Sequence, residues 1–276
     1  ILESLNKIAC KMSLSRFRVI TFGVNNTLLQ FRTSPGKQYG EIGAMFGVRC
    51  DNNELAINFR SNWHKMNRAY PNFGRNSKMG WQNWWRELTA KTFTESGVKL
   101  PEEKMQAFAD QLIEIYKTST CWQLCYGAIE FLNYLKLQQQ LGAKNQKGQV
   151  PFTLGVISNF DPRLNALLRN MKIDHFFDFI LNSYDCNCEK PNKEIFDWAI
   201  RAAELKDVTP DQCLHIGETP ATDYLGAKSA GWHAALIHTK GPDYLIRKYG
   251  QKINEHHCFS SLFDLHKKVS NDFICW

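Results

Sequence analysis

The sequence lacks any long hydrophobic run, which limits the classes of protein that it can encode. No apolar stretch approaches the roughly 20 residues needed to cross a bilayer, so we expect no membrane span. The first 18 residues also lack the continuous apolar centre of a secretory signal. We expect residues 1–14 to be an N-terminal extension, with a mitochondrial presequence as the alternative. The expected location is therefore intracellular, in the cytoplasm or alternatively in mitochondria.

Paired cysteines and continuous basic runs are also missing. The nine cysteines include no CxxC spacing, which favours free thiols over a disulfide framework or a zinc site. The 34 Lys and Arg residues outnumber the 27 Asp and Glu residues, for a formal charge of +7. They are scattered and match no nucleic-acid motif, so we expect no nucleic-acid partner. With 43% hydrophobic and 13% aromatic residues, the chain is instead typical of a packed globular protein.

The first clear element is a strand at residues 17–22, FRVITF, which is rich in β-branched and aromatic residues and ends at Gly23. Residues 34–120 then show helical patterns and no strong strand pattern. One helical segment carries apolar residues at helical spacing, and most of their area should face a core. They are Trp81, Trp84, Trp85, Leu88 and Phe93.

After Cys121 the pattern changes to an alternation of strands and helices. Strands are expected at 152–159, 177–183, 213–217 and 232–239. Helices are expected at 128–141, at 161–171 with Asp161 as N-cap, at 192–205 and at 221–231. The polar residues 144–149 should form a surface connection. Alternation of this kind predicts an α/β fold with a doubly wound, mostly parallel sheet.

The predicted domain organisation follows from this order. Residues 15–32 and 121–276 should form the α/β core, and residues 33–120 should form a helical cap inserted after the first strand. In such sheets the ligand crevice lies at the carboxyl ends of the strands. Four loops meet this condition: those after Phe22, after Ile157, around Lys190 and after Ile216.

The four loops resemble the four motifs of the haloacid dehalogenase superfamily of hydrolases, and the helical block resembles its cap. The resemblance depends on the order and spacing of SRFRVITF..NNTLL, VISNFDPRL, KP..EIF, LHIG and DY.GA, from about Ser15 to the end. It looks closest to a branch with insect members, of which this chain would be a degenerate paralogue. It implies a Rossmann-like core with a helical cap.

The resemblance also implies roles for the first loop. Active members carry there an aspartate nucleophile and, two residues later, an aspartate that acts as general acid and base. The matching positions are Gly23 and Asn25, and Thr27 keeps the threonine of the motif. Glycine has no side chain to attack phosphorus, and an amide cannot exchange a proton near neutral pH. The resemblance therefore predicts a pseudoenzyme.

The other motif positions are partly retained. Ser158 matches the second motif, Lys190 the third, and Glu218 and Asp223 the fourth. In active relatives Lys190 would steady the nucleophile and the phosphate. Here we expect it to pair with Glu218 or Asp223.

Active relatives hold magnesium with the nucleophile, the backbone carbonyl two residues later and an acid of the fourth motif. With the nucleophile missing, Asn25, Glu218 and Asp223 are vestigial metal positions, and we expect no tightly held metal or other cofactor.

Three functions stay open. The first, which we expect, is an inactive pseudophosphatase that acts as a structural or protein-interaction component with an unidentified protein partner. The second is a residual or altered magnesium-dependent phosphohydrolase in which Glu218 or Asp223 activates water. The third is a non-catalytic binder of a phosphorylated metabolite, which would use Thr27, Ser158, Asn159 and Lys190.

Simpler structural roles compete with each of these. Ser158 and Asn159 could satisfy backbone groups at a strand end. Asp223 could cap the helix that follows CLHIG, and His215 could be a packed core histidine.

Overall fold

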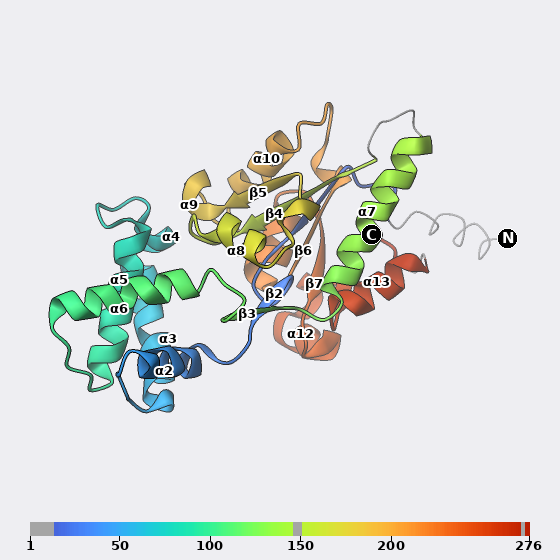
Figure 1. The fold of residues 1–276 in the computed structure, drawn as a ribbon. Coiled ribbons are helices and arrows are strands. Elements are labelled where there is room, and N and C mark those ends of the chain that lie inside the picture. The colour runs from blue at the N-terminus through green and yellow to red at the C-terminus, as the bar shows by residue number, and fades with distance from the viewer. Residues whose placement is uncertain (1–13, 146–150, 272–273) are drawn as a thin grey trace.

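A six-stranded parallel sheet forms the centre of the protein, in the order β5-β4-β1-β6-β7-β8 (Figure 1). The computed structural model describes residues 14–145, 151–271 and 274–276. The strands are β1 Val19–Phe22, β4 Thr153–Ser158, β5 Phe179–Asn182, β6 Cys213–Gly217, β7 His233–Ile237 and β8 Cys258–Phe259. The predicted α/β class with a parallel sheet is therefore confirmed.

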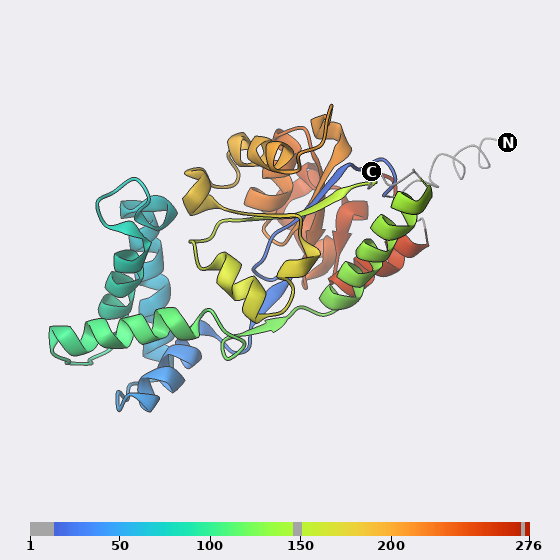
Figure 2. The same cartoon turned by 45° about the horizontal axis from the view of Figure 1, so that its top comes forward.

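Helices cover both faces of this sheet, because alternate strand residues point to opposite sides. Ile20 and Phe22 of β1 pack in one hydrophobic cluster with α7, α8 and α13, whereas Val19 packs in a second cluster with α10, α11 and α12. Figure 2 shows α7 in green and α13 in red side by side along one side of the sheet. These helices are α7 Ala128–Asn145, α8 Leu164–Asn170, α10 Lys193–Ala202, α11 Leu225–Ser229, α12 Gly241–Tyr249 and α13 Leu262–Ser270.

A separate group of helices lies to one side of the sheet (Figure 1). Two short strands precede and follow this group in the chain and pair as an antiparallel ribbon: β2, Leu29–Phe31, pairs with β3, Trp122–Leu124. The group, which we call the cap, consists of α2 Pro35–Met45, α3 Asn52–Ala69, α4 Pro71–Gly74, α5 Gly80–Glu95 and α6 Glu102–Ile115. The domain limits at residues 33 and 120 stay a prediction.

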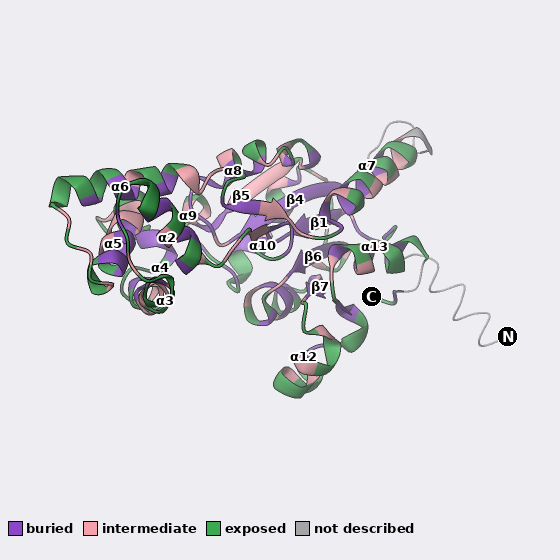
Figure 3. Cartoon of the chain, turned by 60° about the horizontal axis from the view of Figure 1, so that its bottom comes forward, coloured by how far each residue is buried: buried purple, intermediate pink, exposed green. Residues whose placement is uncertain are grey.

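The cap has a small hydrophobic core of its own, formed by Met66, Phe73, Trp84 and Leu88. Trp84 is fully buried, and its Nε1 donates to the carbonyl oxygen of Tyr70 at 3.0 Å. Burying a large apolar side chain stabilises the fold by about 1.5–3 kcal/mol. The cap helices accordingly turn their buried faces inward and their exposed faces to solvent (Figure 3).

Two local expectations were wrong. The helix predicted to start at Asp161 begins at Leu164. The Asp161 carboxylate accepts the backbone amide of Arg163 at 3.0 Å, and it also bonds Trp85 of the cap and the side chain of Arg163. The segment predicted as one helix at 221–231 is a π-helical turn, Pro220–Tyr224, followed by the short α11.

The other short elements are α9 Ser183–Cys186 and four 3-10 turns, Asp174–Phe176, Pro210–Gln212, Gly250–Lys252 and Glu255–His257. Most of the predicted N-terminal extension and of the 144–149 connection lies outside the described residues. In the part of the chain that is described, no helix combines the length and the apolar character that a bilayer crossing requires.

Candidate functional site

The structure brings most of the predicted motif residues to one edge of the sheet. Gly23 directly follows β1, Ser158 ends β4, and Glu218 directly follows β6. A Cβ atom placed on Gly23 would lie 3.5 Å from Thr27 Oγ1 and 3.6 Å from Asp223 Oδ1. These are ordinary van der Waals distances, and Gly23 has no left-handed φ. The backbone at position 23 therefore has room for a Cβ atom, and the chain supplies none.

A buried ion pair occupies the centre of this edge. Lys190 Nζ donates to Asp223 Oδ1 at 2.5 Å, and the two side chains are only 4% and 8% exposed. Lys190 Nζ also donates to the carbonyl oxygen of Ile157 at 2.7 Å. The sequence left the partner of Lys190 open between Glu218 and Asp223, and the structure pairs it with Asp223.

The second carboxylate oxygen of Asp223 is also fully engaged. Oδ2 accepts hydrogen bonds from the backbone amides of Glu218 at 3.0 Å and Thr219 at 2.8 Å. Burial opposes the charge on Asp223, but Lys190 and His215 outweigh it and hold the pKa of this carboxyl well below its usual range. Asp223 therefore folds the loop after β6 back onto itself and does not cap a following helix.

His215 completes the cluster from the middle of β6. Its Nε2 lies 3.2 Å from Asp223 Oδ1 and 3.3 Å from Lys190 Nζ, and its Nδ1 lies 2.8 Å from Thr21 Oγ1. Burial, and then the charge of Lys190, lower the pKa of His215 to about 4. The imidazole is therefore neutral at pH 7. His215 is a packed histidine, as expected, but the sequence gave no sign that it bonds the ion pair.

The loop after β4 is tied to Lys190 through the backbone. The Asn159 amide donates to the carbonyl oxygen of Lys190 at 2.9 Å, and the Lys190 amide N–H donates to Asn159 Oδ1 at 2.8 Å. Both ends of the Asn159 side chain are thus used within the protein. Ser158 is buried, and its hydroxyl makes no hydrogen bond with the described residues.

The turn after Gly23 exposes one motif position and buries another. Asn25 is exposed, whereas Thr27 is fully buried, with Oγ1 3.4 Å from the carbonyl oxygen of Asn25. Glu218 is half-buried and accepts from Thr219 Oγ1 at 3.2 Å. Burial raises the pKa of Glu218, and the hydrogen bond from Thr219 only partly offsets this. Glu218 is the one motif carboxylate that no cation in the described residues neutralises.

These residues do not fit a magnesium ion. Magnesium needs near-octahedral oxygen ligands at about 2.0–2.1 Å, yet position 23 has no oxygen on a side chain. One oxygen of Asp223 already accepts from Lys190, and the other accepts from the backbone amides of Glu218 and Thr219, so a metal would have to displace protein donors. Within the described residues, no group of three or more His, Cys, Asp and Glu side chains could hold a metal.

Comparisons with known proteins agree with the resemblance seen in the sequence. A sequence model described as haloacid dehalogenase-like hydrolase matches residues 17–231, which is most of the chain. This chain belongs to the haloacid dehalogenase-like hydrolase family.

Two relatives are similar over most of their length. The Rhythmically expressed gene 2 protein of Drosophila melanogaster is 57% identical over 266 residues, which cover 96% of this chain and 99% of that protein. Haloacid dehalogenase-like hydrolase domain-containing protein 3 of Xenopus laevis is 33% identical over 228 residues, which cover 83% of this chain and 87% of that protein.

Solved structures share the fold. The L-2-haloacid dehalogenase from Xanthobacter autotrophicus, with chloropropionic acid covalently bound, superimposes with a TM-score of 0.62 at 16% identity. The match covers 92% of this chain and 98% of that one. At this identity the likeness shows the architecture alone, and the chemistry of this chain has to be argued from its own residues.

Removing the cation tests how far the haloacid dehalogenase-like fold depends on the Lys190–Asp223 pair. Lys190→Met should lower the free energy of unfolding by about 3–5 kcal/mol, because it leaves a buried carboxylate without its cation. Lys193→Met is the matched control, since Lys193 forms an exposed pair with Asp197 on α10 and exposed pairs contribute at most about 1 kcal/mol. Urea unfolding measures both, and equal losses would contradict a structural role for Lys190.

Acid should act through His215. Its folded pKa of about 4 lies below the ordinary 6.5, so the unfolded chain binds a proton that the folded chain rejects, and stability falls as pH drops from 6.5 towards 4. At about 1.4 kcal/mol for each pKa unit, the free energy of unfolding falls by about 3 kcal/mol over this pH range. His215→Gln should make this part of the stability profile less steep, measured by urea unfolding at pH 7 and pH 5, and the remaining slope should come from histidines such as His233, whose pKa burial also lowers to about 4. His256→Gln, at an exposed site, should leave it unchanged, and a His215→Gln profile as steep as that of the unmodified protein would refute the assignment.

Proposed function

We propose that this chain is a catalytically inactive member of its family, a pseudophosphatase whose fold serves as a structural or protein-interaction component. The observation that carries the proposal is Gly23, which stands where the attacking carboxylate would be although the backbone there would accept a Cβ atom. Without it there is no atom to form a covalent phosphoryl intermediate. Asn25 adds a second loss, since an amide cannot serve as a general acid or base.

The Lys190–Asp223 pair supports the same proposal. In a working site of this family, Lys190 would meet the nucleophile and the phosphate. Here its donors go to Asp223, Ile157 and His215. The three protons of an ammonium group are thus spent inside the protein. We infer that the former catalytic centre now stabilises the sheet edge.

A protein partner is the part of the proposal that depends on the surface. On the cap, Met45 is 77% exposed and Ile57 is 63% exposed, on two helices that pack together. A contiguous apolar patch would mark a protein-interaction site, and we propose that such a patch includes these two side chains. We propose no nucleic-acid partner.

The cysteines support the proposed cellular location. Seven of them are free thiols, Cys50, Cys121, Cys125, Cys186, Cys188, Cys213 and Cys258. Free thiols are usual in reducing compartments. We therefore place the protein inside the cell, in the cytoplasm, with mitochondria as the alternative.

Glu218 favours one other candidate, an altered phosphohydrolase. Its carboxylate is half-buried, its pKa is raised by burial, and no cation among the described residues neutralises it. Raised carboxyl pKa values are common in catalytic acids and bases. In this mechanism Glu218 would take a proton from water as the water oxygen attacks phosphorus, the bond from phosphorus to the ester oxygen breaks, and the leaving alkoxide takes a proton from solvent.

A phosphate-binding function has less support. Lys190 and Asn159 use their polar groups inside the protein. Of the predicted phosphate contacts, only the Ser158 hydroxyl and the weakly bonded Thr27 hydroxyl are left for a ligand.

A phosphatase assay with p-nitrophenyl phosphate and magnesium tests the proposal. The protein should show no turnover above that of the control Gly23→Asn. Asparagine matches aspartate in size but has no nucleophilic carboxylate. The double variant Gly23→Asp, Asn25→Asp should gain activity, and Gly23→Asp alone should be slower than the double variant by about 10²- to 10⁴-fold, the usual contribution of a general acid or base. Magnesium-dependent turnover by the unmodified protein that disappears in Glu218→Gln would instead establish the altered phosphohydrolase.

A further inference from the structure

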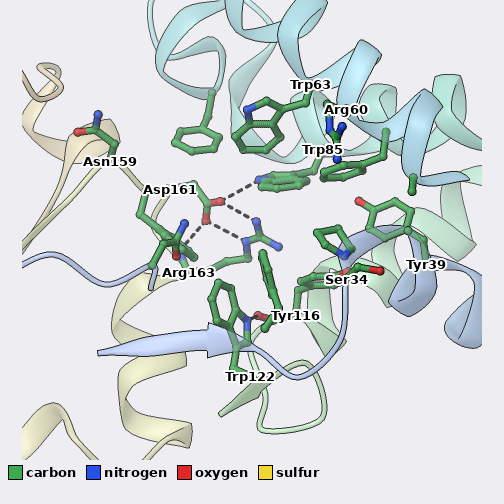
Figure 4. A pocket seen from close by; sticks show the side chains of 18 residues that line it. Ser34, Tyr39, Arg60, Trp63, Trp85, Tyr116, Trp122, Asn159, Asp161 and Arg163 are labelled. Atoms are coloured by element: carbon green, nitrogen blue, oxygen red, sulfur yellow. Dashed lines mark hydrogen bonds and ion pairs between the residues drawn. The ribbon is translucent and has the colours of Figure 1, made fainter. Parts of the chain in front are cut away.

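A cavity of about 320 Å³, which we call the Glu218 cavity, lies at the carboxyl ends of β6 and β7. It is separate from the cavity between the cap and the core that Figure 4 shows. Gln30 of β2 lines the Glu218 cavity, whereas Phe31, the next residue, lines the other, and neighbouring strand residues point to opposite faces. Among the described residues the two cavities share no lining residue, and no residue of the cap lines the Glu218 cavity.

Glu218 is the one charged side chain among the described residues that line this cavity. Burial, and then the nearby charge of Glu218, raise the pKa of the Cys125 thiol to about 12, so this second lining group stays neutral. Burial also raises the pKa of Glu218, because a half-buried carboxylate has lost part of its hydration. The cavity therefore offers a single negative charge that a bound cation would stabilise.

Two basic side chains that follow β7 are turned away from Glu218. The His238 ring stacks on Tyr244 with centroids 5.8 Å apart and planes 20° apart, and Lys240 Nζ lies 4.5 Å from the centre of the same Tyr244 ring. Neither side chain lines the Glu218 cavity. The charge of His238 lowers the pKa of Glu218, but by less than burial raises it. Contact with α12 thus keeps both cations from neutralising the carboxylate.

The rest of the lining supplies neutral oxygen atoms and one accessible aromatic face. Gln30, Thr239 and Ser260 carry amide or hydroxyl oxygens and are exposed or half-buried. An ammonium group has three donors and no acceptor, so it matches a carboxylate that has such oxygens around it. The Tyr126 ring is 67% exposed, and the Phe263 ring supports it with centroids 5.0 Å apart.

We propose that the Glu218 cavity binds a small primary amine that carries an aromatic arm. The ammonium group pairs with the Glu218 carboxylate, and the arm lies on the exposed Tyr126 ring. A phosphate ester or a carboxylate would meet a negative charge, and no lining residue that the structure describes supplies a cation to offset it. A divalent metal would find one carboxylate, since no group of three metal-ligating side chains occurs in the described part of the chain.

The inference goes beyond the proposed function and does not depend on it. Glu218 lines this cavity and not the one between the cap and the core, so an amine can bind whether or not the former catalytic edge turns over a phosphate ester. The two proposals fail separately. Turnover of p-nitrophenyl phosphate would overturn the pseudoenzyme proposal, and absence of amine binding would overturn this one.

Isothermal titration calorimetry with phenethylamine at pH 7 tests the proposal on the full chain. The expected result is a saturable one-to-one site. Glu218→Gln should weaken binding at least tenfold, since it removes a charge-assisted hydrogen bond and keeps the shape of the side chain. Glu255→Gln is the matched control, because it removes the same charge at an exposed position outside the cavity lining. It should bind phenethylamine as the unmodified protein does.

A second position keeps the test independent of how Glu218→Gln folds. Thr239→Lys, at an exposed lining residue, places an ammonium group beside Glu218 and should abolish binding, whereas the uncharged Thr239→Met should weaken it less. The neutral analogue 2-phenylethanol should bind Glu218→Gln and the unmodified protein equally. No saturable heat with millimolar phenethylamine, an equal loss in Glu255→Gln and Glu218→Gln, or displacement of phenethylamine by millimolar magnesium would each overturn the proposal.

Discussion

The Asp223 carboxylate is the constraint on which the former catalytic edge depends. One oxygen receives Lys190, and the other receives the backbone amides of Glu218 and Thr219. A buried carboxylate is tolerated only when its charge is paired and its lone pairs are filled, and both conditions are met here by the protein alone. A metal or a phosphate would have to break these bonds before it could form its own.

In the pseudophosphatase that we propose, this arrangement would link the absence of catalysis to the survival of the fold. When position 23 has no carboxylate, a centre built around magnesium keeps an acid and a lysine that would each be costly to bury alone. The direct contact between Lys190 and Asp223 offsets the cost of burying each charge. Lys190 also joins the end of β4 to the turn that follows β6, since it bonds Ile157 and Asp223. The retained motif residues can thus be explained as structural parts, which is the sense in which we call the chain a pseudophosphatase.

Much of the fold was predictable, because short runs rich in β-branched and apolar residues, such as residues 17–22 and 152–159, mark buried parallel strands. The three-residue strands β2 and β3 were not, since such short segments carry no pattern. Asp161 misled as a helix cap because its partner Trp85 lies 76 positions away in the sequence. The motif order located the edge, but choosing Asp223 over Glu218 as the partner of Lys190 required the path of the loop after β6, which no local pattern encodes.

The central claim is that the chain has no site for a divalent metal because position 23 supplies no carboxylate, and calorimetric titration with magnesium tests it most directly. The unmodified protein should give no saturable heat at millimolar magnesium, whereas Gly23→Asp, which restores one carboxylate beside Asp223, should give a measurable site. A stoichiometric magnesium site in the unmodified protein would contradict the account.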